Sequence, residues 1–292
     1  MKTGFVSIVG RPNVGKSTLL NAIIGEKVAI VSSKPQTTRN RITGIYNEED
    51  VQIVFVDTPG IHTPKNKLGE YMIREVDRAM EDIDAIIMMV EPKAPKTSEL
   101  KLLERFKKKD IPVILVINKV DVNNKEYVAK TIGQFAELYE FASIVPASAL
   151  KKDNVDIVKK ELLKLIEDGG EVFYPDDIAT DQSARQMVAE IIREKLLRSL
   201  SEEVPHGIAV ETIKFTERED KPIIDILADI ICEKASHKGI VIGKNGQTLK
   251  RVASMAREDM EKLLGKKVYL ECFVKVKEGW RDNEKFISEY EQ

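Results

Sequence analysis

The chain has 292 residues, which is long enough for two domains that each bury a core. Its 46 Lys and Arg and 48 Asp and Glu give a net charge of −2, so the whole-chain balance gives no hint of nucleic-acid binding or of an acidic tail. Cys232 and Cys272 have no partner at ligand spacing, which argues against a disulfide framework or a zinc site. No run reaches membrane-spanning length and no signal pattern opens the chain, so we expect a cytoplasmic protein.

The segment Gly10 to Ser17, GRPNVGKS, fits the pattern of a phosphate loop. A β-prone apolar run precedes it, and residues 17–24 have the apolar spacing of a helix. Main-chain amides of residues 13–17 would therefore surround an anion at the positive end of that helix. Lys16 would reach the terminal phosphates, and the Ser17 hydroxyl would bind Mg²⁺. The alternative is a chance match in a glycine-bearing loop, which these flanks argue against.

Residues 30–40 are polar and contain a proline, so we expect a flexible connection and a candidate switch. Residues 41–46 and 51–56 predict an antiparallel hairpin in the nucleotide-binding sheet. Its second strand leads into Asp57, the first residue of DTPG, at the sheet edge where open α/β folds bind ligands. A lone DxxG is common in turns, but this position favours Asp57 as a carboxylate that holds Mg²⁺ through a water.

Three further strands, 85–90, 111–117 and 143–146, alternate with helices at 97–108 and 155–167. This alternation predicts an α/β fold with a doubly wound mixed sheet.

The tetrapeptide NKVD, residues 118–121, follows the second of these strands. The carboxylate of Asp121 can accept hydrogen bonds from guanine N1 and N2, and adenine offers no such pair, so guanine is preferred. Asn118 would brace neighbouring loops, and the Lys119 stem would lie along the purine face. An amide near Ala149, in the ASA turn, would contact guanine O6.

The second half begins after a polar stretch, 167–181, that reads as a linker. A helix at 185–200 and strands at 208–215, 223–232 and 268–276 follow. They indicate a smaller α+β domain.

The loop sequence VIGKNG, ending at Gly246, lies between two helical segments. Because Gly243 and Gly246 have no side chains, phosphates can approach the main chain there. Residues 234–281 hold twelve Lys or Arg against five Asp or Glu, a net of +7, so the rest of the chain sums to −9. A tight helix-to-helix turn would explain a lone GxxG, but this charge segregation favours binding of single-stranded RNA. Trp280 and Phe273 are weaker candidates for base stacking, because single aromatics near a terminus are more often core residues.

These motifs in this order resemble the translation-factor-related GTPases, and the Arg-Pro-Asn loop with paired threonines is similar to the TrmE, Era and Der branch. The second half resembles a type II KH domain. One GTPase domain followed by one KH domain is similar to the Era family, whereas Der has two tandem GTPase domains. The resemblance places the GTPase domain at 1–170, a linker at 171–181, and the KH domain with a C-terminal tail at 182–292.

The resemblance also implies a monomeric GTP-dependent assembly factor for the small (30S) ribosomal subunit, which grips the 3′ end of 16S ribosomal RNA. It implies no binding of DNA and a loose peripheral association with the inner membrane. GTP, GDP and Mg²⁺ are the expected ligands, and GTP would order the switch loops and so control the KH domain.

The expected site residues follow from the motifs and the resemblance together. Lys16, Thr38 and Gly60 would serve hydrolysis, with Thr37 competing with Thr38 as the switch threonine on Mg²⁺ beside Ser17 and Asp57. The expected nucleotide-binding residues are Gly10, Arg11, Pro12, Asn13, Val14, Gly15, Lys16, Ser17, Thr18, Asp57, Thr58, Pro59, Gly60, Ile61, Asn118, Lys119, Asp121, Ser148 and Ala149. The expected RNA-binding residues are Lys238, Gly239, Ile242, Gly243, Lys244, Asn245, Gly246, Lys250 and Arg251.

Ile61 stands where Ras-like proteins have their water-orienting glutamine. An aliphatic side chain cannot polarise water, so we expect slow hydrolysis without a partner.

Two other functions fit parts of the sequence. A metabolic P-loop kinase would use the second half as a lid, although NKVD argues against it. A signalling GTPase would use the second half to dock a protein or a membrane surface.

Overall fold

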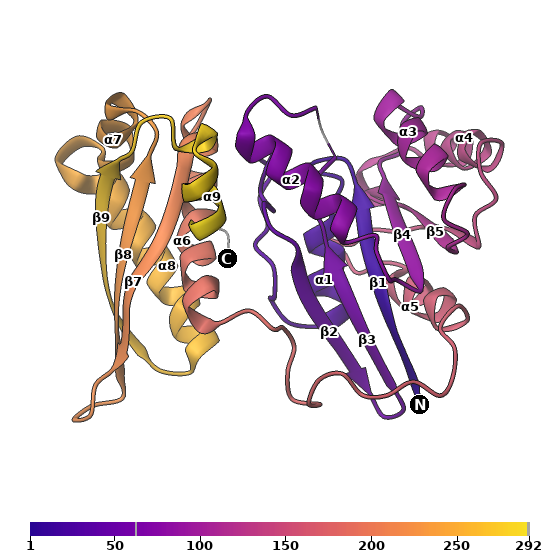
Figure 1. The fold of residues 1–292 in the computed structure, drawn as a ribbon, viewed down its shortest axis with the longest axis horizontal. Helices are drawn as coiled ribbons and strands as arrows, with labels where there is room; N and C mark the ends of the chain where they lie inside the picture. The colour runs from indigo at the N-terminus through magenta and orange to yellow at the C-terminus, as the bar shows by residue number, and fades with distance from the viewer. Residues whose placement is uncertain (62, 291–292) are drawn as a thin grey trace. The chain divides into compact units, whose positions relative to one another are not determined.

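A computed structural model describes residues 1–61 and 63–290, which group into two units (Figure 1). The first unit contains Met1–Val31, Thr38–Pro64 and Gly69–Asp181. The second contains Ser32–Thr37, Lys65–Leu68 and the residues from Gln182 onward. The domain limits expected from the sequence, at 170 and 181, stay a prediction.

Within the described part of the first unit, six strands form one sheet in the order β2-β3-β1-β4-β5-β6, in which β2 alone runs antiparallel to its neighbour. This arrangement confirms the doubly wound mixed sheet. The strands are β1 (Lys2–Gly10), β2 (Ile42–Glu48), β3 (Val51–Asp57), β4 (Ala85–Val90), β5 (Val113–Ile117) and β6 (Ser143–Pro146). The helices are α1 (Lys16–Ile24), α2 (Lys67–Arg78), α3 (Thr97–Phe106), the short η1 (Val120–Val122), α4 (Lys125–Ala136) and α5 (Val155–Leu163).

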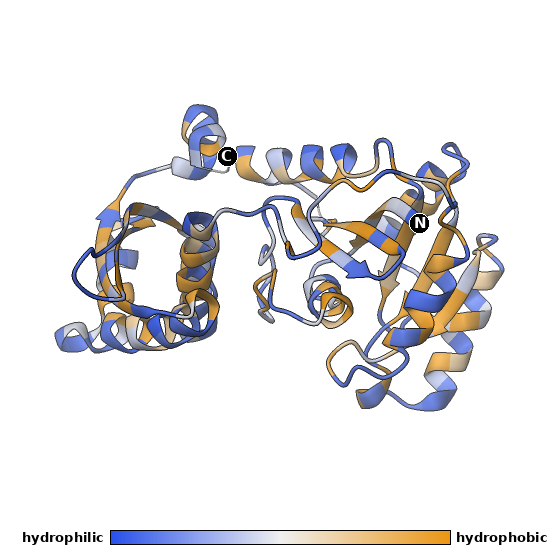
Figure 2. Cartoon of the chain, turned by 90° about the horizontal axis from the view of Figure 1, so that it is seen from below, coloured by the Kyte–Doolittle hydropathy of each residue, from blue (hydrophilic) through white to orange (hydrophobic). Residues whose placement is uncertain are grey.

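Helices cover both faces of this sheet. Apolar residues of α1 and α5 form one core cluster with the strands, and those of α2, α3 and α4 form another on the opposite face. Every residue of β4 and β5 is buried, as expected for parallel strands packed on both sides, and Figure 2 shows the apolar strands between their helices. The polar loops are therefore left at the strand ends, where the site lies.

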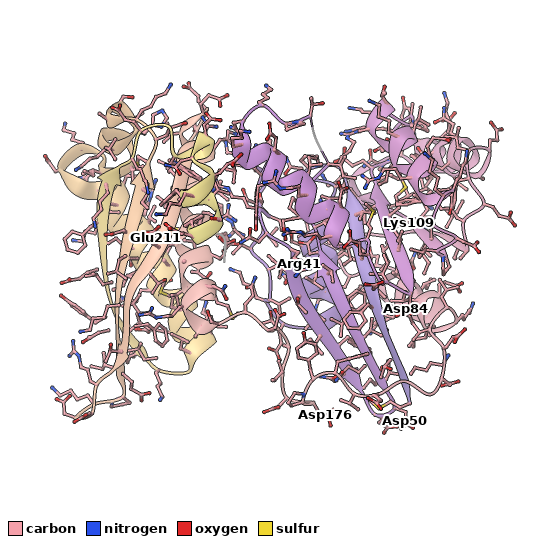
Figure 3. All side chains as sticks on the ribbon, viewed as in Figure 1. Arg41, Asp50, Asp84, Lys109, Asp176 and Glu211 are labelled. Carbon is pink, nitrogen blue, oxygen red and sulfur yellow. The ribbon has the colours of Figure 1, made fainter. Side chains whose placement is uncertain are left out.

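The polar segment after α5 is held on the first unit as a strap over residues 173–180. The buried Gln52 side chain accepts hydrogen bonds from the amides of Phe173 (2.7 Å) and Tyr174 (3.0 Å) and donates one to the Tyr174 carbonyl (2.8 Å). Farther along, the Ile45 amide donates to the Ala179 carbonyl (2.8 Å). Figure 3 labels Asp176 in this strap. The strap thus protects the outer edge of β2, which would otherwise expose unpaired backbone groups.

Replacing Gln52 by leucine is expected to release the start of the strap. The apolar side chain leaves the Phe173 and Tyr174 amides without their acceptor, at a cost of about 1–3 kcal/mol. Amide hydrogen exchange at these two positions should become about 10- to 100-fold faster. Thr180→Val is the control, because the Thr180 hydroxyl donates to the Thr43 carbonyl (2.7 Å) farther along the strap, and its loss should loosen that region instead. Unchanged exchange at Phe173 would contradict the strap.

The second unit has a smaller sheet with helices on one face. In its described residues, three strands lie in the order β7-β8-β9, with β7 antiparallel and β9 parallel to β8. Its elements are α6 (Ala184–Ser199), η2 (Val204–Gly207), β7 (Ile208–Glu217), β8 (Ile223–Cys232), α7 (Ala235–Ile242), η3 (Lys244–Gly246), α8 (Gln247–Leu264), β9 (Lys267–Val276), η4 (Trp280–Asp282) and α9 (Glu284–Tyr290). The order α-β-β-α-α-β confirms the type II KH fold.

The core of this unit lies between the sheet and helices α6 and α8, which contribute residues such as Ile192, Val252 and Met260. Burial raises the pKa of the Cys232 thiol to about 11. Trp280 is fully buried and its indole donates a hydrogen bond to the Gly207 carbonyl (3.0 Å), so the residue is a core anchor and cannot stack on bases. Phe273 remains exposed.

No helix in the described part of the chain is both long enough and apolar enough to cross a bilayer.

Candidate functional site

The phosphate loop lies between the end of β1 and the start of α1, as the sequence predicts. The Lys16 side chain is buried, and its Nζ donates hydrogen bonds to the carbonyls of Gly10 and Arg11, both at 3.3 Å. Burial lowers the pKa of Lys16, and the nearby Asp57 carboxylate raises it in part. A phosphate beside this ammonium would favour its charged form. Arg11, Pro12, Asn13 and Val14 complete the loop, and Thr18 lies in the first turn of α1.

Gly15 allows a close contact between the phosphate loop and Asn118. Its φ of +106° lies in the region that favours glycine, and a Cβ there would approach the Asn118 Nδ2 to 2.2 Å. The buried Asn118 amide donates to the Val14 carbonyl (2.7 Å) and accepts from the Ala149 amide (2.9 Å). Asn118 therefore braces the loops around it, as expected.

The side chains of Ser17, Thr38 and Asp57 meet at one point. Asp57 Oδ2 accepts a hydrogen bond from Ser17 Oγ (2.6 Å) and lies 3.3 Å from Thr38 Oγ1, and the two hydroxyls are 3.0 Å apart. Asp57 is fully buried, and among the described residues its Oδ1 has no hydrogen-bond partner. Burial raises the pKa of Asp57, while Lys16 and the two hydroxyls oppose that rise.

Two hydroxyls and a carboxylate with an unused buried oxygen fit a hard divalent cation such as Mg²⁺. Ser17 and Thr38 would hold the ion directly and Asp57 through a water. When bound, the ion supplies charge neutralisation between the phosphates. Thr37 is placed differently, since its Oγ1 donates to the Lys34 carbonyl (2.7 Å).

Thr38→Ala is expected to weaken Mg²⁺-dependent binding of a GTP analogue by about tenfold or more, because it removes a hydroxyl that would hold the ion. GDP affinity should change by less than about threefold, because the switch threonine serves the triphosphate state. Thr37→Ala is the matched variant and should stay within about threefold of wild type for both nucleotides. Equilibrium titration with fluorescent nucleotides measures both, and a larger effect at Thr37 would reverse the assignment.

DTPG lies against the phosphate loop. Thr58 Oγ1 donates to the Ile8 carbonyl (2.9 Å), and the Ile61 amide donates to the Gly10 carbonyl (3.1 Å). Pro59 and Gly60 are buried, and a Cβ on Gly60 would meet Pro12 at 2.6 Å. The Gly60 backbone therefore lies directly against the phosphate loop, as its expected role at the terminal phosphate requires.

The residues expected to recognise the base lie on two adjoining loops at the ends of β5 and β6. Asp121 is exposed in η1, while Ser148 and Ala149 are buried in the neighbouring turn. The Val120 amide donates to the Ala147 carbonyl (3.3 Å), which joins the two loops. Together they can offer a carboxylate and an amide to one guanine ring.

One residue near the site was not expected. Arg11 of the phosphate loop lies 3.6 Å from the buried Glu99 carboxylate, and Glu99 also accepts from the Lys96 amide (2.7 Å) at the start of α3. Burial raises the pKa of Glu99, and the Lys96 amide and Arg11 oppose that rise. Glu99 is the third residue of α3, a position typical of a helix cap, but nothing in the sequence linked Glu99 to Arg11.

The proposed RNA loop joins α7 to α8 in the second unit. Gly243 and Gly246 both have φ of +74°, and Asn245 between them has φ of +51°. Ile242 packs against the core, which fixes the end of α7. The four nearby cations, Lys238, Lys244, Lys250 and Arg251, are all exposed, as is Gly239. A basic surface thus surrounds a bare backbone turn at the start of α8, an arrangement suited to phosphates.

The first unit is therefore a P-loop GTPase, and the helix–loop–helix on a three-stranded sheet makes the described part of the second a KH domain. A family model described as 50S ribosome-binding GTPase matches residues 5–119, and one described as KH domain matches residues 203–281. The chain belongs to the GTPase Era family, as the sequence resemblance indicated.

Relatives named GTPase Era cover nearly the whole chain. That of Clostridium botulinum (strain Loch Maree / Type A3) is 52% identical over 289 residues, which is 99% of this chain and 97% of that protein. That of Clostridium kluyveri is 50% identical over 290 residues, 99% of this chain and 98% of that protein.

Two similar crystal structures are 39% identical with a TM-score of 0.95 and cover 99% of this chain. One is a variant of Aquifex aeolicus Era bound to GDP.AlF4-, of which 99% is covered. The other is Era in complex with MgGDPNP and nucleotides 1506–1542 of 16S ribosomal RNA, of which 98% is covered.

Proposed function

We propose that this GTPase uses its nucleotide state to control how its KH domain holds the 3′ end of 16S ribosomal RNA during assembly of the small ribosomal subunit. The observation that supports this most is the similar Era structure that contains both MgGDPNP and nucleotides 1506–1542 of 16S ribosomal RNA. In this chain, the cluster of Ser17, Thr38 and Asp57 suits the Mg²⁺-bound nucleotide, and the basic loop at Gly246 suits the RNA.

Within this function, each residue set has a separate task. Lys16 and the phosphate-loop amides neutralise and orient the phosphates, and Thr38 with the Gly60 backbone distinguishes GTP from GDP. Asp121 selects guanine. The Gly243–Gly246 turn receives RNA phosphates, and the surrounding cations raise affinity in a salt-dependent manner.

Hydrolysis is slow in the isolated protein, because Ile61 is apolar and water must be oriented by backbone groups or by a partner. The protein acts as a monomer in the cytoplasm, with loose association at the inner membrane as a further part of the proposal.

A binding experiment tests this function. A fluorescent 37-nucleotide RNA that covers nucleotides 1506–1542 should bind in the presence of MgGDPNP, and its affinity should fall steeply with salt. A scrambled RNA of the same length should bind at least about tenfold more weakly. Equal binding of both RNAs would contradict recognition of the 16S sequence, and absence of RNA binding would favour docking of a protein or a membrane.

A second candidate is action on the large subunit, which the family-model description 50S ribosome-binding GTPase favours. Co-sedimentation with purified 30S and 50S particles separates the two. The small-subunit function requires preferential binding to 30S particles.

A further inference from the structure

Glu91 lies beside the base-recognition loop, although no sequence motif singles it out. It directly follows β4, whose last residue, Val90, is in register with Ile117 at the end of β5. The Asn118 amide donates to the Val90 carbonyl (2.8 Å), which extends the pairing past the strand ends. Glu91 and Lys119 are therefore neighbours at the same edge of the sheet.

The Lys119 ammonium bridges two separate parts of the site. Its Nζ donates one hydrogen bond to Glu91 Oε1 (2.5 Å) and another to the Asn13 carbonyl of the phosphate loop (2.7 Å). The other oxygen of Glu91 accepts from the Lys93 ammonium (2.6 Å). The side chain of Glu91 is 16% exposed, that of Lys119 37% and that of Lys93 58%.

Glu91 is charged at neutral pH. Burial alone would raise the pKa of its carboxyl, but the Lys119 and Lys93 ammonium groups outweigh burial and leave the pKa below its ordinary value. The half-buried Lys119 ammonium is thus paired with the charged, half-buried Glu91 carboxylate. A carbonyl such as that of Asn13 lacks a full charge, so it holds the Lys119 ammonium less strongly than a carboxylate does.

The side chain of Lys119 has a flexible four-carbon stem. This stem can lie along a purine face only if the ammonium group at its end is held in place. Fixing a free lysine side chain costs about 2 kcal/mol of rotamer entropy when the nucleotide binds. We propose that Glu91 is a positioning residue for the guanine nucleotide. Its carboxylate clamps the Lys119 ammonium against the Asn13 carbonyl, and this joins the base-recognition loop to the phosphate loop before the nucleotide binds. This inference rests on the proposed binding of guanine nucleotide.

Variants of Glu91 test the clamp in the full-length protein. Glu91→Ala should raise the Kd for fluorescent GDP and for a fluorescent GTP analogue about 5- to 30-fold. The increase should come from faster nucleotide dissociation, which stopped-flow fluorescence measures. Glu91→Gln keeps an acceptor but loses the charge, so its Kd should lie between those of wild type and Glu91→Ala. The kcat for GTP at saturation should stay within about twofold of wild type, because the hydrogen bonds of the Glu91 carboxylate go to Lys119 and Lys93 and not to Ser17, Thr38 or Asp57.

Lys93→Ala is the matched control, since it removes the other cation on the same carboxylate and should change Kd by less than about twofold. A double-mutant cycle gives a second readout. If Glu91 acts through Lys119, Glu91→Ala should add less than about twofold to the loss caused by Lys119→Ala.

Three results would overturn the clamp: unchanged dissociation rates in both Glu91 variants, losses that multiply with Lys119→Ala, or an equal loss in Lys93→Ala. A change in the melting temperature of nucleotide-free Glu91→Gln as large as that of a core variant would also overturn it, because the role would then be structural. Failure of the wild-type protein to bind guanine nucleotide is a different result and contradicts the proposed function instead.

Discussion

Replacing Gly15 by alanine is expected to lower the affinity for guanine nucleotides by about 100-fold or more. The added Cβ would lie 2.2 Å from the Asn118 amide nitrogen, so the buried amide must move. That movement breaks the bonds of Asn118 to Val14 and Ala149, which hold the phosphate loop and the turn at residues 147–149 together. Isothermal titration with GDP and with a GTP analogue measures the loss.

Gly25→Ala is the control for backbone strain, because Gly25 ends the same helix with φ of +89° and has open space around its Cβ position. It should cost about 1–2 kcal/mol of stability and leave nucleotide affinity within about threefold. Similar losses of affinity in the two variants would mean that left-handed backbone strain, and not the contact with Asn118, accounts for the effect.

Replacing Gly246 by aspartate is expected to weaken RNA binding by about 10- to 100-fold without unfolding the KH domain. Gly246 precedes the first turn of α8, where a carboxylate is favourable for the helix, and the Cβ position is open. The new charge would lie where we expect an RNA phosphate to bind. Fluorescence anisotropy with labelled RNA measures the affinity, and guanine-nucleotide affinity should be unchanged.

Gly265→Asp is the matched control at the opposite end of α8. Gly265 has φ of +63° and an open Cβ position, so the strain is similar and the added charge is the same. Its effect on RNA affinity should be below about threefold, because it lies a whole 18-residue helix away from the loop. Equal losses in both variants would show that net charge alone, and not the loop, determines binding.

The sequence was most informative where a local pattern and a chemical motif coincide. The apolar strands that precede Gly10, Asp57 and Asn118 predict parallel strand ends, and the structure confirms that the three strands share one sheet. Helix periodicity placed α3 and α6 to within two residues at each end.

Other features were missed because their signal is weak or nonlocal. Helix α4 begins after Asn124, whose side chain accepts a hydrogen bond from the Glu126 amide, so an asparagine cap was the local signal for this helix. The sequence of the strap predicts only a polar linker, because no local pattern reveals that Gln52 pairs with residues more than 100 positions away. The ion pairs of Glu91 and Glu99 depend on sheet order in the same way.

The choice between Thr37 and Thr38 as the residue beside the metal site also depends on the three-dimensional structure. Adjacent threonines are equivalent in the sequence, but the hydroxyl of Thr38 alone of the two lies at the Asp57 carboxylate in the described structure. The roles of both residues remain predictions until the variants are measured.

The proposed switch requires that the nucleotide bound to the first unit controls the RNA affinity of the second unit. Its most direct test is titration of labelled RNA, nucleotides 1506–1542, against the full-length protein with MgGDPNP, with MgGDP, or without nucleotide. We expect an RNA affinity at least about fivefold higher with MgGDPNP than with MgGDP, which corresponds to about 1 kcal/mol of coupling. Equal affinities in the three conditions would contradict it.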